Sequence, residues 1–150
     1  MKSAVSQRAQ ELFAQHYNCA QSVYAAAAQG DGLTEAQRLA LAAPFGGGIA
    51  TQGEVCGALT GALLALGEAS EAALAADPIA ARRIVYERSA RLTGEFRQLH
   101  GSILCRELTG CQLNTEEGMR AFQQSGKRAS LCSNLVAFAA EKASDSIASS

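Results

Sequence analysis

The sequence predicts an all-α fold: a compact, single-domain helical bundle of about six to seven helices. Alanine is abundant, valine and isoleucine are scarce, and the chain contains only two prolines, a composition that favours helix nearly everywhere. Apolar residues recur at helical spacing in several segments, and no segment shows the alternation typical of a strand. A chain of 150 residues also suits one core, so residues 1–150 are expected to form one domain.

The N-terminal third contains three predicted helices. The first is expected over residues 3–16, whose apolar side chains form one stripe at helical spacing. Asn18 is expected to cap a second helix that begins at Cys19, because its side chain can accept from the free backbone N–H groups. The third is expected over residues 34–43, which open with the capping-box pattern of threonine followed three residues later by glutamine.

The centre of the fold is expected between Arg38 and Glu68, where Glu54 is the only charged residue. A helix starting near Glu54 would place Gly57 and Gly61 on one face. Glycines at this spacing allow a neighbouring backbone to approach closely.

The C-terminal half contains the clearest helix start, because Asp77 followed by Pro78 is the pattern of a cap and first-turn proline. That helix is expected to run to about His100. Three further helices are expected: a short one from about residue 102, one over residues 114–124 and one over residues 128–143. Residues 144–150 are expected to fray.

Charge and hydropathy disfavour two classes of partner. The formal net charge is −1 and 18% of residues are charged, so no footprint for nucleic acid or an anionic membrane is present. The N-terminal segment carries Arg8 and Glu11 where a secretory signal has an apolar block. The apolar run 55–67 is shorter than the ~20 residues that span a bilayer. We therefore expect a cytoplasmic protein without membrane insertion, whose apolar helices are compatible with a homo-oligomer.

Five cysteines are the residues whose chemistry most needs an explanation. In a reducing compartment they are expected to bind metal or take part in redox chemistry rather than form permanent disulfides. Cys19, Cys56 and Cys105 each fall in the predicted first turn of a helix, where N–H groups favour the thiolate. Basic residues near Cys105 and Cys132 add to this tendency. The alternative is that each cysteine is a small buried hydrophobe.

No two of the cysteines are spaced as a C-x-x-C pair, which a single loop could wrap around a metal. A shared site would therefore have to be assembled by the fold. Cys111 follows Cys105 closely enough for a transient disulfide if the chain turns sharply. His16 and His100 precede Cys19 and Cys105 by a few residues and could act as ligands or proton carriers, although solvated histidines are commoner.

The glycine-rich segment FGGGIATQG, residues 45–53, matches neither a phosphate-binding loop nor a dinucleotide fingerprint. Its glycines allow positive φ angles and leave backbone N–H groups uncovered beside Cys56. Those groups could hold an anion, donate to a sulfur or let helices pack closely, and close packing is the favoured interpretation.

Five motifs together resemble the C_GCAxxG_C_C family of redox-active proteins: NCAQSV at 18–23, FGGG at 45–48, CGALTG at 56–61, CREL at 105–108 and the late Cys132. The resemblance extends over about residues 8–140. It implies a small, mostly helical protein in which four cysteines converge on one site, namely Cys19, Cys56, Cys105 and Cys132. Cys111 lies outside this set.

The family is also similar to the non-haem part of split-Soret cytochromes, in which such a cysteine set is associated with an iron–sulfur cluster. The resemblance therefore implies a cluster, here expected to be of the two-iron type, in a redox or electron-transfer protein. No C-x-x-C-H is present to attach a c-type haem. A redox partner protein is implied but not identified.

Three alternatives stay open at this point. The first is a thiol–disulfide redox protein or sensor without metal, in which Cys56 or Cys19 is the attacking thiolate. The second is an interaction domain with a structural zinc ion on the four cysteines. The third is a helical bundle in which the cysteines only pack.

Overall fold

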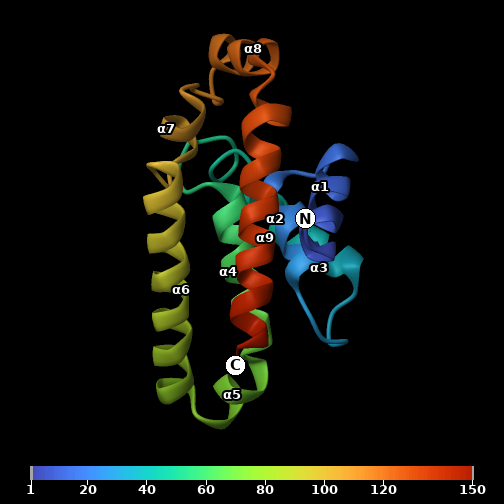
Figure 1. Cartoon of the computed structure of the whole chain (residues 1–150), viewed down its shortest axis with the longest axis vertical. Coiled ribbons are helices and arrows are strands. Elements are labelled where there is room, and N and C mark those ends of the chain that lie inside the picture. The colour runs from blue at the N-terminus through green and yellow to red at the C-terminus, as the bar shows by residue number, and fades with distance from the viewer. Residues whose placement is uncertain (1, 150) are drawn as a thin grey trace.

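Residues 2–149, the part of the chain that the structure describes, form an all-α fold in this computed structural model (Figure 1). The fold class is as predicted, although the described residues form nine α-helices instead of about six to seven. In chain order the helices are α1 (Ala4–Ala14), α2 (Cys19–Ala27), α3 (Glu35–Ala42), a 3-10 helix (Ala43–Phe45), α4 (Gly57–Ala69), α5 (Glu71–Ala76), α6 (Pro78–His100), α7 (Cys105–Thr109), α8 (Glu116–Ser125), a π-helical segment (Arg128–Cys132) and α9 (Ser133–Ala148).

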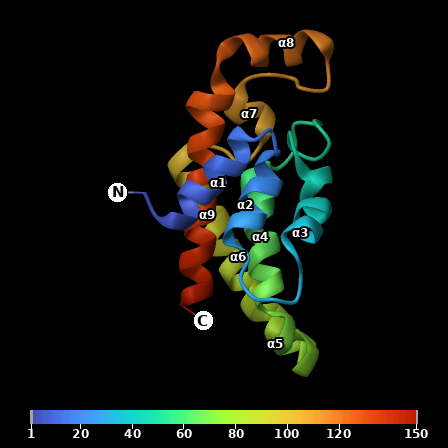
Figure 2. The ribbon, with the colours of Figure 1, turned by 90° about the vertical axis from the view of Figure 1, so that its right-hand side faces the viewer.

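Helix α4 lies at the centre and packs against α2 and α9, with the long α6 alongside (Figures 1 and 2). Helices α1 to α3 cover the side of α4 opposite α6. Helix α5 lies at one end of the molecule, and α7 and α8 lie at the other. The glycine-rich turn before α4 is also at the α8 end, so this end contains the segments that carry the cysteines.

The core is built largely from alanine, which lets the central helices approach one another closely. Ala20, Ala58, Ala62 and Ala139 are fully buried. A Cβ added at Gly61 would lie 2.6 Å from the carbonyl oxygen of Ala20. The predicted close approach on the glycine side of α4 is therefore confirmed, and the neighbouring backbone is that of α2.

Several predicted helix starts are confirmed with their caps. The Asn18 side chain accepts from the N–H of Gln21 at 2.9 Å, and Thr34 caps α3 in the same way. Asp77 Oδ1 accepts from the N–H of Ala80 at 3.1 Å. These caps satisfy backbone donors that the first turn of a helix leaves free.

The start of α4 differs from the prediction, because the helix begins at Gly57 and not near Glu54. Val55 instead forms an isolated antiparallel bridge with Leu104. The Cys56 N–H donates to the Ile103 carbonyl at 2.7 Å. The Glu54 carbonyl accepts from the Cys105 N–H at 2.7 Å, so it is not available to the hydrogen bond from Ala58 that would extend α4 to Glu54.

The chain end also differs, because α9 continues to Ala148 beyond the predicted end at residue 143. Ile147 packs against the core cluster, which anchors the additional turn. The predicted fraying over residues 144–150 is therefore wrong for residues 144–148, which are helical. Residue 150 lies outside the described residues.

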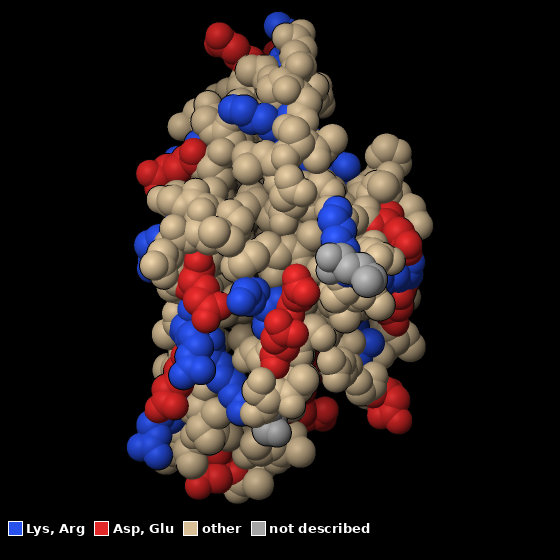
Figure 3. Space-filling view, viewed as in Figure 1, with Lys and Arg blue, Asp and Glu red and all other residues tan. Residues whose placement is uncertain are grey.

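Helices α6 and α9 run side by side with mixed surface charge. Figure 3 shows basic and acidic side chains interspersed along this face. Lys142 of α9 lies 3.8 Å from Glu95 of α6. No helix within residues 2–149 combines the length and apolar character needed to cross a membrane.

Candidate four-cysteine site

The four cysteines of the predicted set come from four separate segments of the chain. Cys19 is the first residue of α2, and Cys105 is the first residue of α7. Cys56 immediately precedes α4, and Cys132 ends the π-helical segment before α9. The predicted placement of three of them at helix starts is confirmed.

Backbone pairing brings Cys56 next to the segment of Cys105. The N–H of Cys105 donates to the Glu54 carbonyl at 2.7 Å, beside the reciprocal bond from Cys56 to Ile103. These two bonds flank the Val55–Leu104 bridge. The short antiparallel pair therefore fixes two of the thiols relative to each other.

Close packing of α2 on α4 brings Cys19 next to the segment of Cys56. A Cβ added at Gly57 would lie 3.0 Å from the Cys19 sulfur. Only a residue without a side chain leaves this space, so Gly57 allows Cys19 to sit against the start of α4.

Cys19 lies close enough to the other three thiols to affect their ionisation. A negative charge on Cys19 contributes to raising the pKa values of Cys56, Cys105 and Cys132. A charge on Cys105 does the same for Cys56 and Cys132. The fold thus gathers in one region thiols that lie more than a hundred positions apart in the sequence.

Burial is the largest influence on each of these thiols. It raises the pKa of Cys105 to about 11 and that of Cys132 to about 12. It also raises the pKa values of Cys19 and Cys56. The expectation that helix starts lower the pKa values of these thiols is therefore wrong. Removal from water raises the pKa values by more than the helix-start N–H donors lower them.

Those N–H donors are nevertheless present. The sulfur of Cys19 receives hydrogen bonds from the backbone of Gly47 and Ala20, which lower its pKa against the effect of burial. Hydrogen bonds from Ala58 and Leu59 act in the same direction on Cys56. The thiols are protonated in neutral water, and the donors are already placed for a negatively charged sulfur.

The glycine-rich segment forms a left-handed turn of five consecutive residues with positive φ. The angles are 66° at Gly47, 71° at Gly48, 63° at Ile49, 48° at Ala50 and 64° at Thr51. This conformation costs roughly 1–2 kcal/mol for each residue that is not glycine. Strained backbone of this kind persists only where the surroundings hold it in place.

The left-handed turn contacts two of the cysteines. The Gly47 N–H donates to the Cys19 sulfur, and a Cβ added at Gly48 would lie 2.7 Å from the Cβ of Cys105. Close packing, the favoured interpretation of this segment, is confirmed by the contacts of Gly46 and Gly48, and donation from the Gly47 N–H to a sulfur occurs as well. The recipient is Cys19 and not Cys56, because α2 packs across the turn.

Two cations lie beside the thiols. Arg128 donates to the Phe13 carbonyl at 2.8 Å and its guanidinium carbon lies 3.7 Å from the centre of the Phe13 ring. Lys127 donates to the Thr109 carbonyl at 2.6 Å. Within residues 2–149 neither forms an ion pair with a carboxylate. Both charges lower the pKa of Cys132, so they favour negative charge in this region.

A cavity of about 450 Å³ adjoins the thiols, and Cys19, Cys105 and Cys132 line it. Met119 and Phe122 of α8 form part of its wall. Helix α8 has no buried residue, so it covers the cavity without belonging to the core.

A comparison with protein families matches residues 17–146 to the family described as "Putative redox-active protein (C_GCAxxG_C_C)". The chain belongs to the C_GCAxxG_C_C family. The predicted membership is thereby confirmed, and the match includes all four cysteines of the set. No curated protein and no solved structure matches the chain.

The C_GCAxxG_C_C site has the donor chemistry that an iron–sulfur cluster requires. Four thiols gather in one region, in which Cys56 and Cys105 are buried and Cys19 and Cys132 are half-buried. Backbone N–H groups donate to two of the sulfur atoms, and two cations lie nearby. No three His, Cys, Asp or Glu side chains within residues 2–149 form a group that could hold a metal ion. The residues match a cluster in donor type and share one region, but they do not form a metal-holding group in this structure, so the assignment of each as a ligand is a proposal.

The other sequence candidates lie at different distances from the site. Cys111 is outside the cavity, although its charge contributes to raising the pKa of Cys105. His16 is exposed and lines the cavity. His100 is not among the cavity residues and packs between Phe96 and Phe138, with ring centroids 4.7 and 4.9 Å away.

Sequence reasoning missed Thr109, which is buried and donates a hydrogen bond from its hydroxyl to the Cys105 carbonyl at 2.8 Å. Its hydroxyl also lowers the pKa of Cys105 against the effect of burial. The spacing of four residues after Cys105 in a helix was the available signal. The α8 residues Met119 and Phe122 carry no such signal.

Proposed function

We propose that the protein transfers electrons on an iron–sulfur cluster of the two-iron type, bound by Cys19, Cys56, Cys105 and Cys132. The observation that carries this proposal is that Cys19 lies close enough to the other three thiols for a charge on it to raise the pKa values of Cys56, Cys105 and Cys132. Four thiolates cannot stay together away from water without a compensating positive charge. Protons supply it in the free protein, and iron would supply it in the cluster.

The residues around the thiols have distinct roles in this proposal. The N–H groups of Gly47 and Ala58 donate to sulfur, which stabilises negative charge and tunes a reduction potential. Lys127 and Arg128 offset the remaining negative charge. A bound cluster would accept and release single electrons, and the buried surroundings would keep water from the sulfur atoms.

The second candidate is a reversible disulfide between Cys19 and Cys56 without metal. The contact between the Cys19 sulfur and Gly57, the residue after Cys56, favours it. The raised pKa values of both thiols oppose it, because the thiolate is the attacking form. Structural zinc on the same four cysteines is the third reading that the experiment must separate.

The proposal also includes a cellular compartment and a redox partner protein. A cytoplasmic location would keep the thiols reduced, and a redox partner protein would supply or accept electrons. Neither nucleic acid nor membrane insertion has a role in it. A homo-oligomer is compatible with it.

The test is the iron, sulfide and zinc content of protein purified without oxygen, together with its visible absorption. We expect iron and sulfide in equal amounts and an absorption that is lost in air. Serine substitution of any of the four cysteines should abolish it, whereas Cys111→Ser, the matched control, should retain it.

Three results would contradict the proposal. A colourless protein that takes up no iron and sulfide on reconstitution argues against a cluster. Zinc at one ion per chain, with a large loss of thermal stability in chelator, would indicate a structural zinc site. Rapid alkylation of Cys19 or Cys56 at neutral pH in metal-free protein would indicate thiol–disulfide chemistry.

A further inference from the structure

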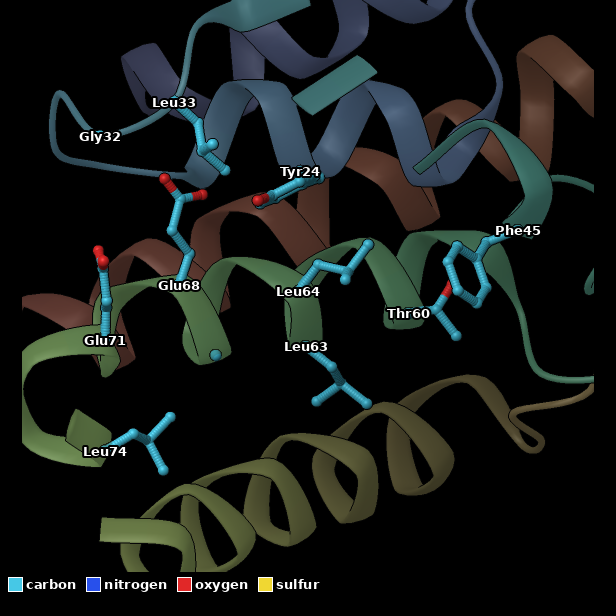
Figure 4. Close-up of a pocket in the computed structure, with 11 residues that line it drawn as sticks. Tyr24, Gly32, Leu33, Phe45, Thr60, Leu63, Leu64, Glu68, Glu71 and Leu74 are labelled. Carbon is cyan, nitrogen blue, oxygen red and sulfur yellow. The ribbon is translucent and has the colours of Figure 1, made fainter. Parts of the chain in front are cut away.

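A second pocket lies along α4 and contains no cysteine. Its volume is about 710 Å³, within the range of roughly 300–1,000 Å³ typical of small-molecule sites. Helix α4 forms its base, and the segment around Gly32 and the start of α5 close one end (Figure 4). Phe45 and Thr60 lie at the opposite end.

The long walls of this pocket are apolar. Leu63 and Leu64 lie along its middle, with Leu33 above and Leu74 below in the view of Figure 4. The Phe45 ring closes the end opposite Glu71. An occupant would therefore need an extended apolar part to remove these side chains from water.

The other end of the pocket is polar because of a buried ion pair. Arg38 and Glu68 approach to 2.6 Å, with side chains 9% and 12% exposed. The hydrogen bond from Arg38 lowers the pKa of Glu68, so this carboxylate stays charged. Burial, followed by the charge and hydrogen bonding of Glu68, raises the pKa of Tyr24 to about 12, so the phenol stays neutral.

Glu71 adds an uncompensated negative charge at the same end. It lines the pocket close to Gly32 and is exposed. Within residues 2–149 no lysine, arginine or histidine lies within ion-pair distance of it. Since Arg38 cancels the charge of Glu68, Glu71 leaves this end of the pocket with a net negative charge.

The geometry points to a binding site for an elongated apolar molecule that carries an ammonium group at one end. The ammonium group lies beside Glu71, and the apolar chain lies along Leu63 and Leu64 toward Phe45. The match of charge at one end and apolar surface along the rest identifies this class of ligand. The site is separate from the proposed cluster site and does not depend on it.

Gly67 offers a way to close the pocket without disturbing the fold. It lines the pocket, and a Cβ added there would have no neighbour within 4 Å. Gly67→Leu therefore fills the pocket from within α4. Gly94 is a matched control, because it is also a helical glycine with no neighbour within 4 Å but lies in α6, outside the pocket.

The experiment is calorimetric titration of the protein as purified with decylamine, decanoic acid and decanol at neutral pH. We expect decylammonium to bind one molecule per chain and about tenfold more tightly than decanoate, through attraction to Glu71 in place of repulsion. Glu71→Gln should reduce this preference to about threefold or less. Gly67→Leu should weaken decylammonium binding more than about tenfold, and Gly94→Leu should leave it unchanged.

Equal binding of decylammonium and decanoate, or unchanged binding in Gly67→Leu, would overturn the proposal. A third result would also overturn it: the protein is a dimer, binds no decylammonium, and becomes a monomer in Gly67→Leu. The pocket would then be a contact between two copies of the chain. The iron and sulfide content is measured separately, so failure of this proposal is distinguishable from failure of the cluster proposal.

Discussion

Gly57 lies directly against Cys19, so that a Cβ at Gly57 would be 3.0 Å from the cysteine sulfur and 3.0 Å from the Phe45 carbonyl oxygen. One missing side chain therefore lets α2 and α4 close around the cysteine site. The Cys19 sulfur lies next to the position that a Gly57 side chain would take. A substitution at Gly57 therefore tests both the helix packing and the proposed role of Cys19 as a ligand.

Gly57→Ala should displace Cys19 and destabilise the protein by about 1–3 kcal/mol, because both neighbours are too close for a methyl group. Iron uptake should fall with it if Cys19 is a ligand. Gly67→Ala is the control in the same helix, with nothing within 4 Å, and should raise stability by about 0.5–1 kcal/mol. Urea unfolding and iron content provide the two measurements, and a Gly57→Ala protein as stable and iron-rich as the unsubstituted one would contradict the contact.

Gly48→Ala tests the left-handed turn. A methyl group there would lie 2.6 Å from the Glu54 backbone and 2.7 Å from the Cβ of Cys105. We expect a loss of at least about 2 kcal/mol, from left-handed strain and from overpacking together. Gly30→Ala is the matched control, because Gly30 has a φ of 99° and no neighbour within 4 Å. It reports strain alone, so equal losses in the two variants would show that contact with Cys105 is unimportant.

Features controlled by neighbouring residues could be predicted from the sequence. The caps at Asn18 and Asp77 depend on backbone groups three positions away, and the residue types in that window are sufficient. The four-cysteine set came from motif resemblance. The family match supports that resemblance, because it spans all five motifs and the four cysteines.

Features that depend on distant segments could not be predicted. The backbone pairing of residues 54–56 with 103–105 joins segments with no local signal for each other, and its bond to the Glu54 carbonyl explains why α4 starts later than expected. The glycines suggested positive φ angles, but Ile49, Ala50 and Thr51 adopt them too, which side-chain type does not favour. Burial of the thiols depends on tertiary packing, so helix position alone gave the wrong direction for their pKa values.

Glu68→Gln should destabilise the protein by roughly 3–5 kcal/mol, because it leaves the buried Arg38 guanidinium without a charged partner. Replacing both residues, as Arg38→Met with Glu68→Leu, should cost much less. Glu116→Gln is the control, because its pair with Arg120 is exposed, at 90% and 62%, and should change stability by less than about 0.5 kcal/mol. Equal effects of the Glu68 and Glu116 substitutions in urea unfolding would contradict the importance of the buried pair.

The stability of the protein should decrease as the pH falls from about 7 toward 5, with His100 contributing to the decrease. Burial lowers the pKa of His100, and its Nε2 has no hydrogen-bond partner. His100 therefore takes up a proton at a higher pH in the unfolded chain than in the folded chain. The contribution of His100 to the free energy of unfolding is full above the unfolded pKa and is lost as the pH falls through the folded pKa. His100→Phe should flatten this part of the profile in urea unfolding, since a ring between Phe96 and Phe138 is retained. A profile that is equally steep in His100→Phe would show that other groups control it.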